Sequence, residues 1–221
     1  MSNKPDALIS SAGFSKRIPA FKPLLLYDQL PFIITIILKN FLICQNIFIV
    51  LGHRSEDIIK VINDFFIYPP KNLPNSLIPI DPDLKILRAN IKFIFNPDYS
   101  EGMFGSLQTG LQHMPASDWI LYHFVDQPQL PTSFYREISK QIDNEYDWIQ
   151  PIYKNKKGHP IIFNKSLANK IKEEKKDSNL KSFTRNKFIR KKMWDCHYPQ
   201  ILVNFNTPED LMRGGITLEH F

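Results

Sequence analysis

The sequence is short of glycine and cysteine and has no long apolar run. It contains 8 glycines and 2 cysteines in 221 residues. Two distant cysteines, Cys44 and Cys196, exclude a disulfide framework and a cysteine-rich metal site. We expect Cys44 to be a small core residue in a reducing cytoplasm. The first residues lack a signal-peptide pattern, and the apolar stretches near 30–38 and 41–51 are too short to cross a membrane. We therefore expect a cytoplasmic protein with no membrane partner.

The overall composition fits one folded domain over residues 1–221, with 43% apolar and 23% charged residues. The formal charge of +6 permits anionic partners without identifying one. Five of the 17 prolines lie in residues 68–90, which we expect to form an exposed excursion. Residues 154–192 hold 14 of the 28 basic residues. This basic segment is either a solvated helical face or a surface for an anionic acceptor or partner.

Apolar and polar patterns predict strands alternating with helices. Strands are expected at 7–13, 46–52, 91–96, 118–126, 147–153, 160–163 and 200–205. Helices are expected at 31–43, from 55 with Ser55 as N-cap, at 103–114, at 131–144 and after Thr207, and residues 164–192 are helical in pattern. The alternation indicates an α/β fold with a largely parallel sheet.

The loop SSAGFSKRIPAFK, residues 10–22, is the strongest single signal for a binding site. A strand leads to Gly13, after which backbone N–H groups lack strand partners and can face an anion. Ser15, Lys16, Arg17 and Lys22 add hydroxyl and cationic donors suited to a triphosphate. The loop lacks the Walker and dinucleotide-binding glycine spacings. The alternative is a basic surface turn.

Polar residues also follow two later strands. Asp126 lies at the carboxyl end of the fourth strand, where a carboxylate can hold Mg²⁺ on substrate phosphates. It could equally cap the next turn. Asn204 and Asn206 could supply further oxygen ligands, whereas Glu209 and Asp210 fit the start of a helix better than catalysis.

Five motifs in order resemble the MobA-like NTP transferases, the molybdenum cofactor nucleotidyltransferases, and most closely their cytidylyltransferase branch. The motifs are SSAGFSKRIP with Lys22, NPDYSEGMFGSLQTGL at 96–111, VDQP at 125–128, GHPIIF at 158–163 and NFNTPEDL at 204–211. Five of the eight glycines fall on these motifs, and the resemblance spans residues 8–211.

The resemblance implies a three-layer α/β/α sandwich with the Rossmann-like fold of nucleotide-diphospho-sugar transferases. It also implies Mg²⁺-dependent transfer of a nucleoside monophosphate from an NTP to a phosphorylated acceptor such as a molybdopterin-type cofactor, with release of pyrophosphate. The Ala12-Gly13 pair favours CTP over GTP. Carried over by position, the implied nucleotide-binding residues are Ser11, Ala12, Gly13, Ser15, Arg17, Lys22, Gly102, Met103 and Ser106, the catalytic residues Arg17, Lys22 and Asp126, the acceptor-binding residues Gly158 and His159, and the metal ligands Asp126, Asn204 and Asn206.

Several motif positions depart from the family pattern. Pro19 lacks the N–H of the usual glycine, Val125 replaces another glycine, and Asn204 and Asn206 replace aspartates. One alternative is therefore a nucleotide- or cofactor-binding member with weakened catalysis. Another is an interaction module that uses the basic segment, although we do not expect nucleic acid because no recognition motif is present. We predict structural or surface roles for His53, His113, His123, His197 and His220.

Overall fold

The computed structural model describes residues 4–74, 77, 83–175 and 178–216, so His220 and Lys176 lie outside the described residues. Its main sheet has the order β10-β7-β9-β6-β1-β4-β5, with β8 paired to β7. The strands are β1 (Asp6–Ser11), β4 (Ile47–Leu51), β5 (Ile91–Phe95), β6 (Trp119–Phe124), β7 (Trp148–Tyr153), β8 (Lys156–Lys157), β9 (Ile161–Asn164) and β10 (Lys191–Asp195). Strand β9 is antiparallel to β6 and β7, β8 is antiparallel to β7, and the other pairs in this sheet are parallel.

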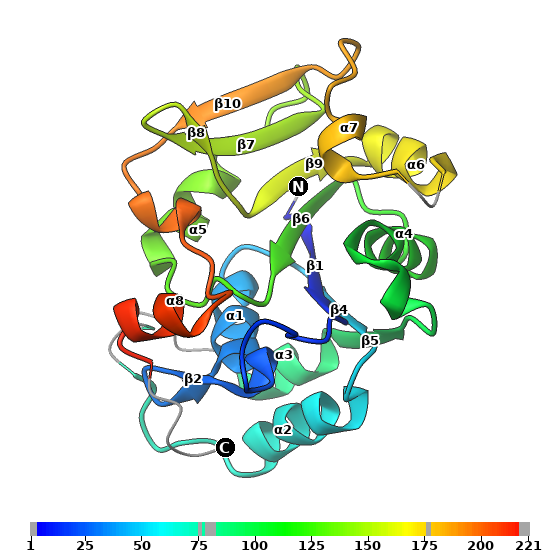
Figure 1. The fold of residues 1–221 in the computed structure, drawn as a ribbon. Coiled ribbons are helices and arrows are strands. Elements are labelled where there is room, and N and C mark those ends of the chain that lie inside the picture. The colour runs from blue at the N-terminus through cyan, green and yellow to red at the C-terminus, as the bar shows by residue number, and fades with distance from the viewer. Residues whose placement is uncertain (1–3, 75–76, 78–82, 176–177, 217–221) are drawn as a thin grey trace.

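Helices cover both faces of this sheet (Figure 1). The helices are α1 (Phe32–Phe41), α2 (Ser55–Ile67), α3 (Leu84–Ala89), α4 (Met103–His113), α5 (Thr132–Ser139), α6 (Lys165–Glu173), α7 (Leu180–Phe183) and α8 (Pro208–Arg213). Ala7 and Ile9 face a core with α1, α2 and α5, whereas Leu8 faces a core with α4 and α6. Because central strands are buried on both faces, they read as continuous apolar runs. The predicted three-layer fold with a mostly parallel sheet is confirmed.

Smaller elements complete the connections. Strands β2 (Leu26–Tyr27) and β3 (Leu30–Pro31) form a separate two-stranded antiparallel sheet. There are also short 3₁₀ helices among the described residues: η1 (Lys22–Leu24), η3 (Tyr99–Glu101) and η4 (Pro199–Leu202). The prediction that Thr207 caps the last helix is confirmed, because Thr207 and Asp210 form a capping box at the start of α8. Cys44 is buried in the core, as predicted. The described residues include no helix with the length and apolarity to span a membrane.

The prediction of a strand at 200–205 is wrong. Pro199 begins the 3₁₀ turn η4, and the carbonyl of Val203 accepts hydrogen bonds from side-chain amides instead of a neighbouring strand. The last strand is β10, which lies inside and beyond the segment predicted as helical. Strand β10 is the outermost strand, beside β7, and is only half-buried. It therefore contains Lys191 and Lys192 and lacks the continuous apolar run by which the central strands were predicted.

Two local predictions also need correction. Ser55 is the first residue of α2 and not its N-cap; the cap is Arg54, held in the left-handed conformation at φ 51° and paired with Asp57. The proline-rich segment 68–90 is not wholly exposed, because Leu77 and Leu87 are buried in the core. Residues 75–76 and 78–82 of this segment lie outside the described residues.

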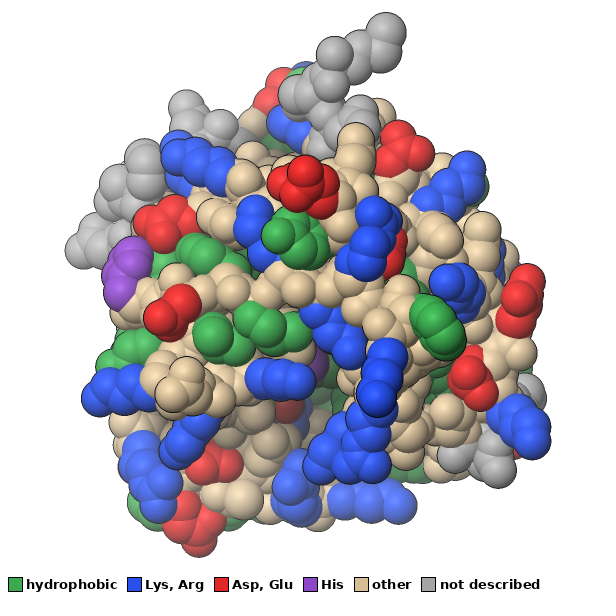
Figure 2. Space-filling model, turned by 90° about the horizontal axis from the view of Figure 1, so that it is seen from above, with side chains coloured by type: hydrophobic (Ala, Val, Ile, Leu, Met, Phe, Trp, Pro, Cys, Tyr) green, Lys and Arg blue, Asp and Glu red, His purple; other side chains and the backbone are tan. Residues whose placement is uncertain are grey.

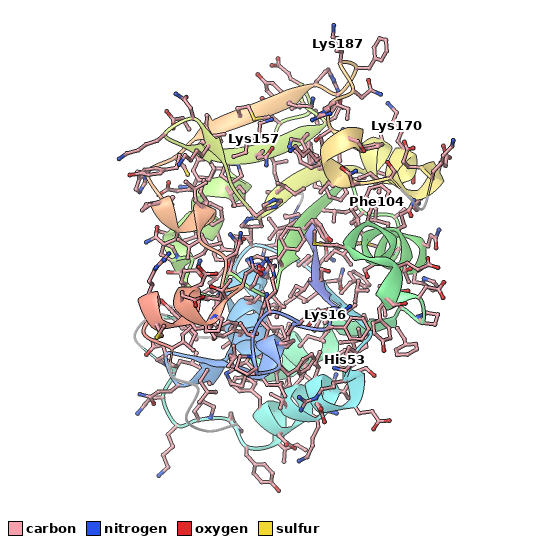
Figure 3. All side chains as sticks on the ribbon, in the orientation of Figure 1. Lys16, His53, Phe104, Lys157, Lys170 and Lys187 are labelled. Atoms are coloured by element: carbon pink, nitrogen blue, oxygen red, sulfur yellow. The ribbon has the colours of Figure 1, made fainter. Side chains whose placement is uncertain are left out.

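The basic segment forms a positively charged surface at the β10 edge of the sheet. Lys157, Lys170 and Lys187 lie on β8, on α6 and in the loop before β10, at the upper end of the view in Figure 3. Figure 2, which looks onto this end, shows Lys and Arg side chains gathered densely in the lower part of the view.

Candidate active site

A cavity of about 260 Å³ lies at the carboxyl ends of β1 and β6, which are neighbours in the sheet. Open α/β sheets bind their ligands at this edge. We call it the site cavity. It is lined by Ser10, Ser11, Gly13, Phe14, Ser15, Lys22, Pro23, Tyr99, Ser100, Gly102, Met103, Ser106, Phe124, Val125 and Asp126.

Lys22 lies at the centre of the polar cluster in this cavity. It begins η1, and its backbone N–H donates to the Ser15 hydroxyl at 3.1 Å. Its ammonium donates to Asn206 Oδ1 at 2.8 Å and lies 3.5 Å from Asp126 Oδ2. Burial lowers the pKa of Lys22, although Asp126 opposes this. The ammonium is therefore held between two side-chain oxygens at the cavity.

Asp126 follows β6 and is largely shielded from solvent, with a side chain 17% exposed. Burial raises its pKa, while Lys22 and Arg17 act in the opposite direction. Its Oδ1 atom is buried and has no hydrogen-bond partner in the structure. An unsatisfied buried carboxylate oxygen is costly unless a cation or donor completes it.

The loop between β1 and η1 presents its polar groups in different ways. Gly13 and Ser15 line the cavity, with Ser15 in the left-handed region at φ 55°. Arg17 is exposed, and its charge acts on both Lys22 and Asp126. Lys16 is also exposed, and its ammonium lies 4.8 Å from the centre of the Phe14 ring.

Ser11 and Ala12, also predicted for this loop, are both buried. The Ser11 hydroxyl lies at the cavity without a hydrogen-bond partner in the structure. Ala12 is a core residue, and its carbonyl accepts from the His53 backbone N–H at 3.1 Å. Ser11 therefore borders the cavity, whereas Ala12 belongs to the core beneath the turn.

The two asparagines expected to face a metal are not equivalent. Asn206 joins the Lys22 cluster, and its backbone N–H is fixed by Asp210 Oδ2 at 3.1 Å. Asn204 is half-buried, and neither asparagine is part of the cavity lining among the described residues, so Asn206 is linked to the cavity through Lys22. Between them, the N–H of Phe205 donates to the Asp126 carbonyl at 3.0 Å, which ties this segment to the β6 turn.

The start of α4 forms the opposite wall. Gly102 has φ 111°, a conformation that favours glycine, and this turn brings Met103 and Ser106 to the cavity. The Ser106 hydroxyl already donates to the Gly102 carbonyl and accepts from Asn96. A second cavity of about 230 Å³ continues beyond Met103 and Phe124, against the side chains of Phe104, Leu107, Tyr122 and Leu180, among others.

Among the described residues, neither Gly158 nor His159 lines the site cavity, and His159 is linked to it through Phe124. The His159 ring packs edge-on against Phe124, with ring centres 4.7 Å apart, and Phe124 lines both cavities. Burial lowers the pKa of His159 to about 4, so its imidazole is neutral at pH 7. Gly158 leaves room for Ile201, which a Cβ would meet at 2.5 Å.

Sequence reasoning missed the aromatic side of the site. Phe14 and Tyr99 line the cavity, with ring centres 5.1 Å apart. His53 packs 5.0 Å from Phe14, and Figure 3 shows His53 and Lys16 close to each other beside α2. Tyr99 occupies the aromatic position of the 96–111 motif, so that motif carried a signal, whereas Phe14 occupies a variable position.

The residues present fit a divalent cation that takes most of its ligands from substrate. Among the described residues, no group of three or more His, Cys, Asp or Glu side chains could hold a metal ion. Asn206 Oδ1 already accepts from Lys22. The unsatisfied Asp126 Oδ1 remains, and Mg²⁺ is commonly held by one or two carboxylates together with substrate phosphates and water.

Comparisons with known proteins identify the family of the chain. The family model of the MobA-like NTP transferase domain matches residues 7–192. The molybdenum cofactor cytidylyltransferase of Escherichia coli (strain K12) is 22% identical over 214 residues, which cover 94% of this chain and 93% of that protein. A probable molybdenum cofactor guanylyltransferase of Bacillus cytotoxicus is 27% identical over 117 residues, which cover 50% of this chain and 57% of that protein.

A solved structure shares the fold at low identity. The crystal structure of Rv0371C in complex with manganese, from Mycobacterium tuberculosis H37Rv, has a TM-score of 0.66 and 16% identity to this chain. The match covers 99% of this chain and 100% of that chain. At this identity the likeness concerns the fold alone.

Proposed function

The chain belongs to the MobA-like NTP transferase family, a family of nucleotidyltransferases, and on this premise we propose that it transfers CMP from CTP to a phosphorylated, molybdopterin-type acceptor and releases pyrophosphate. The observation that carries the proposal is the cluster that Lys22 and Asp126, which line the site cavity, form with Asn206, which accepts a hydrogen bond from Lys22. It places a cation and a carboxylate with an unsatisfied oxygen beside a loop of polar backbone groups.

In this proposal the loop from Gly13 to Lys22 binds the triphosphate. Backbone N–H groups after Gly13 and the Ser11 hydroxyl contact phosphate oxygens. Lys22 exchanges Asn206 for a phosphate oxygen, and Arg17 faces the outer phosphates from the exposed side of the loop. Both cations offset the charge that grows on the leaving pyrophosphate.

Asp126 and the substrate phosphates would together hold Mg²⁺, which when bound supplies charge neutralisation and lines up acceptor and α-phosphate. The acceptor phosphate is already ionised at neutral pH, so the residues of the site need not remove a proton. This fits the neutral His159 imidazole, which borders Phe124 and is suited to hydrogen-bond an acceptor. Asn204 could add an oxygen ligand only by turning toward Asp126.

The preference for CTP rests on two supports. The cytidylyltransferase of Escherichia coli matches nearly the whole chain, whereas the guanylyltransferase of Bacillus cytotoxicus matches half of it. The Ala12-Gly13 pair, in place of two glycines, is the second. The cavity beside Met103, with aromatic and apolar side chains, offers a surface for an uncharged planar ring.

Measuring pyrophosphate release tests the proposal. The purified protein is incubated with each of the four NTPs, Mg²⁺ and molybdopterin, and Asp126→Asn serves as the inactive control. We expect release with CTP above that with GTP and at least about a hundredfold loss in Asp126→Asn. Equal rates for the protein and the Asp126→Asn variant would contradict the proposal.

A second candidate function is nucleotide binding with weak turnover. Asn206 gives its only carboxamide oxygen to Lys22, and Pro19 and Val125 stand at positions that are glycine in the family pattern. This candidate predicts CTP binding by calorimetry without pyrophosphate release, and rapid turnover would exclude it.

A further inference from the structure

Lys39 is a buried lysine on α1, with a relative exposure of 1%. The other buried residues of this helix are apolar except Thr35 and Asn40, neither of which carries a charge. Lysine is almost never fully buried without a partner, because removing an ammonium from water is costly. A methionine of similar length would fill the same space without that cost. The lysine therefore calls for a role other than packing.

The ammonium of Lys39 contacts the turn that follows Asp126. It donates to the Pro128 carbonyl at 2.5 Å, a short charge-assisted hydrogen bond across 89 residues of sequence. The same turn is fixed from its other side: the side-chain amides of Gln127 and Gln129 both donate to the Val203 carbonyl. The Asp126 turn is thus held between α1 and the segment that leads to Asn206.

We propose that Lys39 is a positioning residue whose buried ammonium holds the Pro128 carbonyl and thereby fixes the turn that carries Asp126. The proposal rests on the proposed function, since that function gives Asp126 a reaction to serve. It also implies that the buried ammonium of Lys39 lowers the stability of the fold while it keeps the Asp126 turn ordered.

The charge of Lys39 depends on groups from several elements. The Tyr27 ring lies 5.5 Å from its ammonium, Asp28 in the β2–β3 turn favours the charged form, and His123 on β6 lies within electrostatic range. Burial lowers the pKa of Lys39 to about 7 and that of His123 to about 3, so His123 is neutral where Lys39 titrates. The hold on Pro128 should therefore weaken as the pH rises above neutrality.

The stability of the fold should depend on pH in a defined direction. The folded pKa of Lys39 is below its unfolded value of 10.5, so the cost of burial is fully present below about pH 7 and fades as the pH rises toward 10.5. A Lys39→Met variant lacks this cost. Its advantage in melting temperature over the unaltered protein should be largest below pH 7 and should shrink toward pH 10.

The test compares Lys39→Met with Lys39→Gln and with Lys60→Met, a matched change on the exposed face of α2. In Lys39→Met we expect a melting temperature at pH 6 raised by at least about 3 °C. Hydrogen–deuterium exchange in the peptide 124–130 should be faster, and kcat for pyrophosphate release should fall about tenfold or more with KM for CTP within about threefold. Lys39→Gln keeps an N–H donor and should recover part of the exchange protection. Lys60→Met should change none of these quantities.

Two results would overturn the proposal. One is unchanged exchange in 124–130 in Lys39→Met and Lys39→Gln. The other is a loss of stability in Lys39→Met with exchange faster throughout the protein, which would make Lys39 a general structural residue. If the unaltered protein releases no pyrophosphate with any NTP while Lys39→Met still loosens 124–130 alone, the proposed function fails and the positioning role stands.

Discussion

Replacing Lys22 with an uncharged residue should destabilise the fold, and the size of the loss should depend on whether Asp126 still carries its charge. At their 3.5 Å separation, two unit charges at an effective dielectric constant of about 20 attract by roughly 5 kcal/mol. Desolvation of both groups offsets part of this gain. We therefore expect Lys22→Met to cost about 3 kcal/mol at pH 7, since breaking a shielded pair leaves an uncompensated carboxylate.

The double variant isolates the interaction between the two charges. Lys22→Met combined with Asp126→Asn leaves neither charge stranded, so its loss of stability should be smaller than the sum of the two single losses by about 2 kcal/mol. Urea unfolding followed by tryptophan fluorescence measures all four proteins. Additivity of the two single losses within about 0.5 kcal/mol would refute the inference that the pair is coupled in the folded state.

The pH dependence of Lys22→Met provides a second check. Lys22 is the main group that lowers the pKa of Asp126, so its removal should raise that pKa further above its ordinary value of 3.8. When folding raises the pKa of a carboxyl group, the folded state holds the proton more tightly than the unfolded state. The resulting stability is fully present below the unfolded pKa and is lost as the pH rises through the folded pKa. Lys22→Met should therefore regain stability between pH 7 and pH 4, by up to about 1.4 kcal/mol per pH unit. A cost that stays constant over this range would contradict the reasoning.

Three further outcomes follow from other contacts. Asn206→Asp restores a second carboxylate and should lower the half-saturating Mg²⁺ concentration for pyrophosphate release about tenfold. Gly110→Ala places a Cβ 2.8 Å from side chains of β1 and β4 and should cost about 1–2 kcal/mol in urea unfolding; Gly105→Ala, whose Cβ meets nothing within 4 Å, should instead stabilise by up to about 1 kcal/mol. Arg190 holds the pKa of Asp147 at about 2. The stability that this ion pair contributes is therefore present above pH 3.8 and is lost as the pH falls toward 2. In Arg190→Gln, the pKa of Asp147 measured by carboxyl-carbon NMR titration should return toward 3.8.

The parts of the site that lie at strand ends could be predicted from the sequence. Gly13 and Asp126 each follow an apolar run, and parallel neighbours bring their carboxyl ends to one edge of the sheet. The chemistry of the 10–22 loop predicted Lys22, the search for oxygen ligands predicted Asn206, and the family motifs added Gly102. In the structure Gly13, Lys22, Gly102 and Asp126 line one cavity, and Asn206 contacts Lys22. Their catalytic and binding roles remain proposals.

Other features had no local signal. The bond between Lys22 and Asn206 joins residues 184 positions apart, and Phe124 becomes a shared wall only because α4 and the His159 segment meet around it. The 200–205 strand was mispredicted because alternating apolar residues can face a core without pairing with a strand. The role proposed for Lys39 had no signal in the sequence either, because its partner is the carbonyl of a proline 89 residues away.

The net charge of the protein is distributed unevenly between the basic segment at the β10 edge and the rest of the chain. Residues 154–192 contain 14 basic and 3 acidic residues, which leaves 14 basic and 19 acidic residues for the rest of the chain. The first set carries a net charge of +11 and the second −5 near pH 7. The protein is therefore a strong electric dipole, and it should turn this end toward any negatively charged surface it approaches at low salt. The pI of 9.2 depends on the total charge alone and does not reveal this uneven distribution.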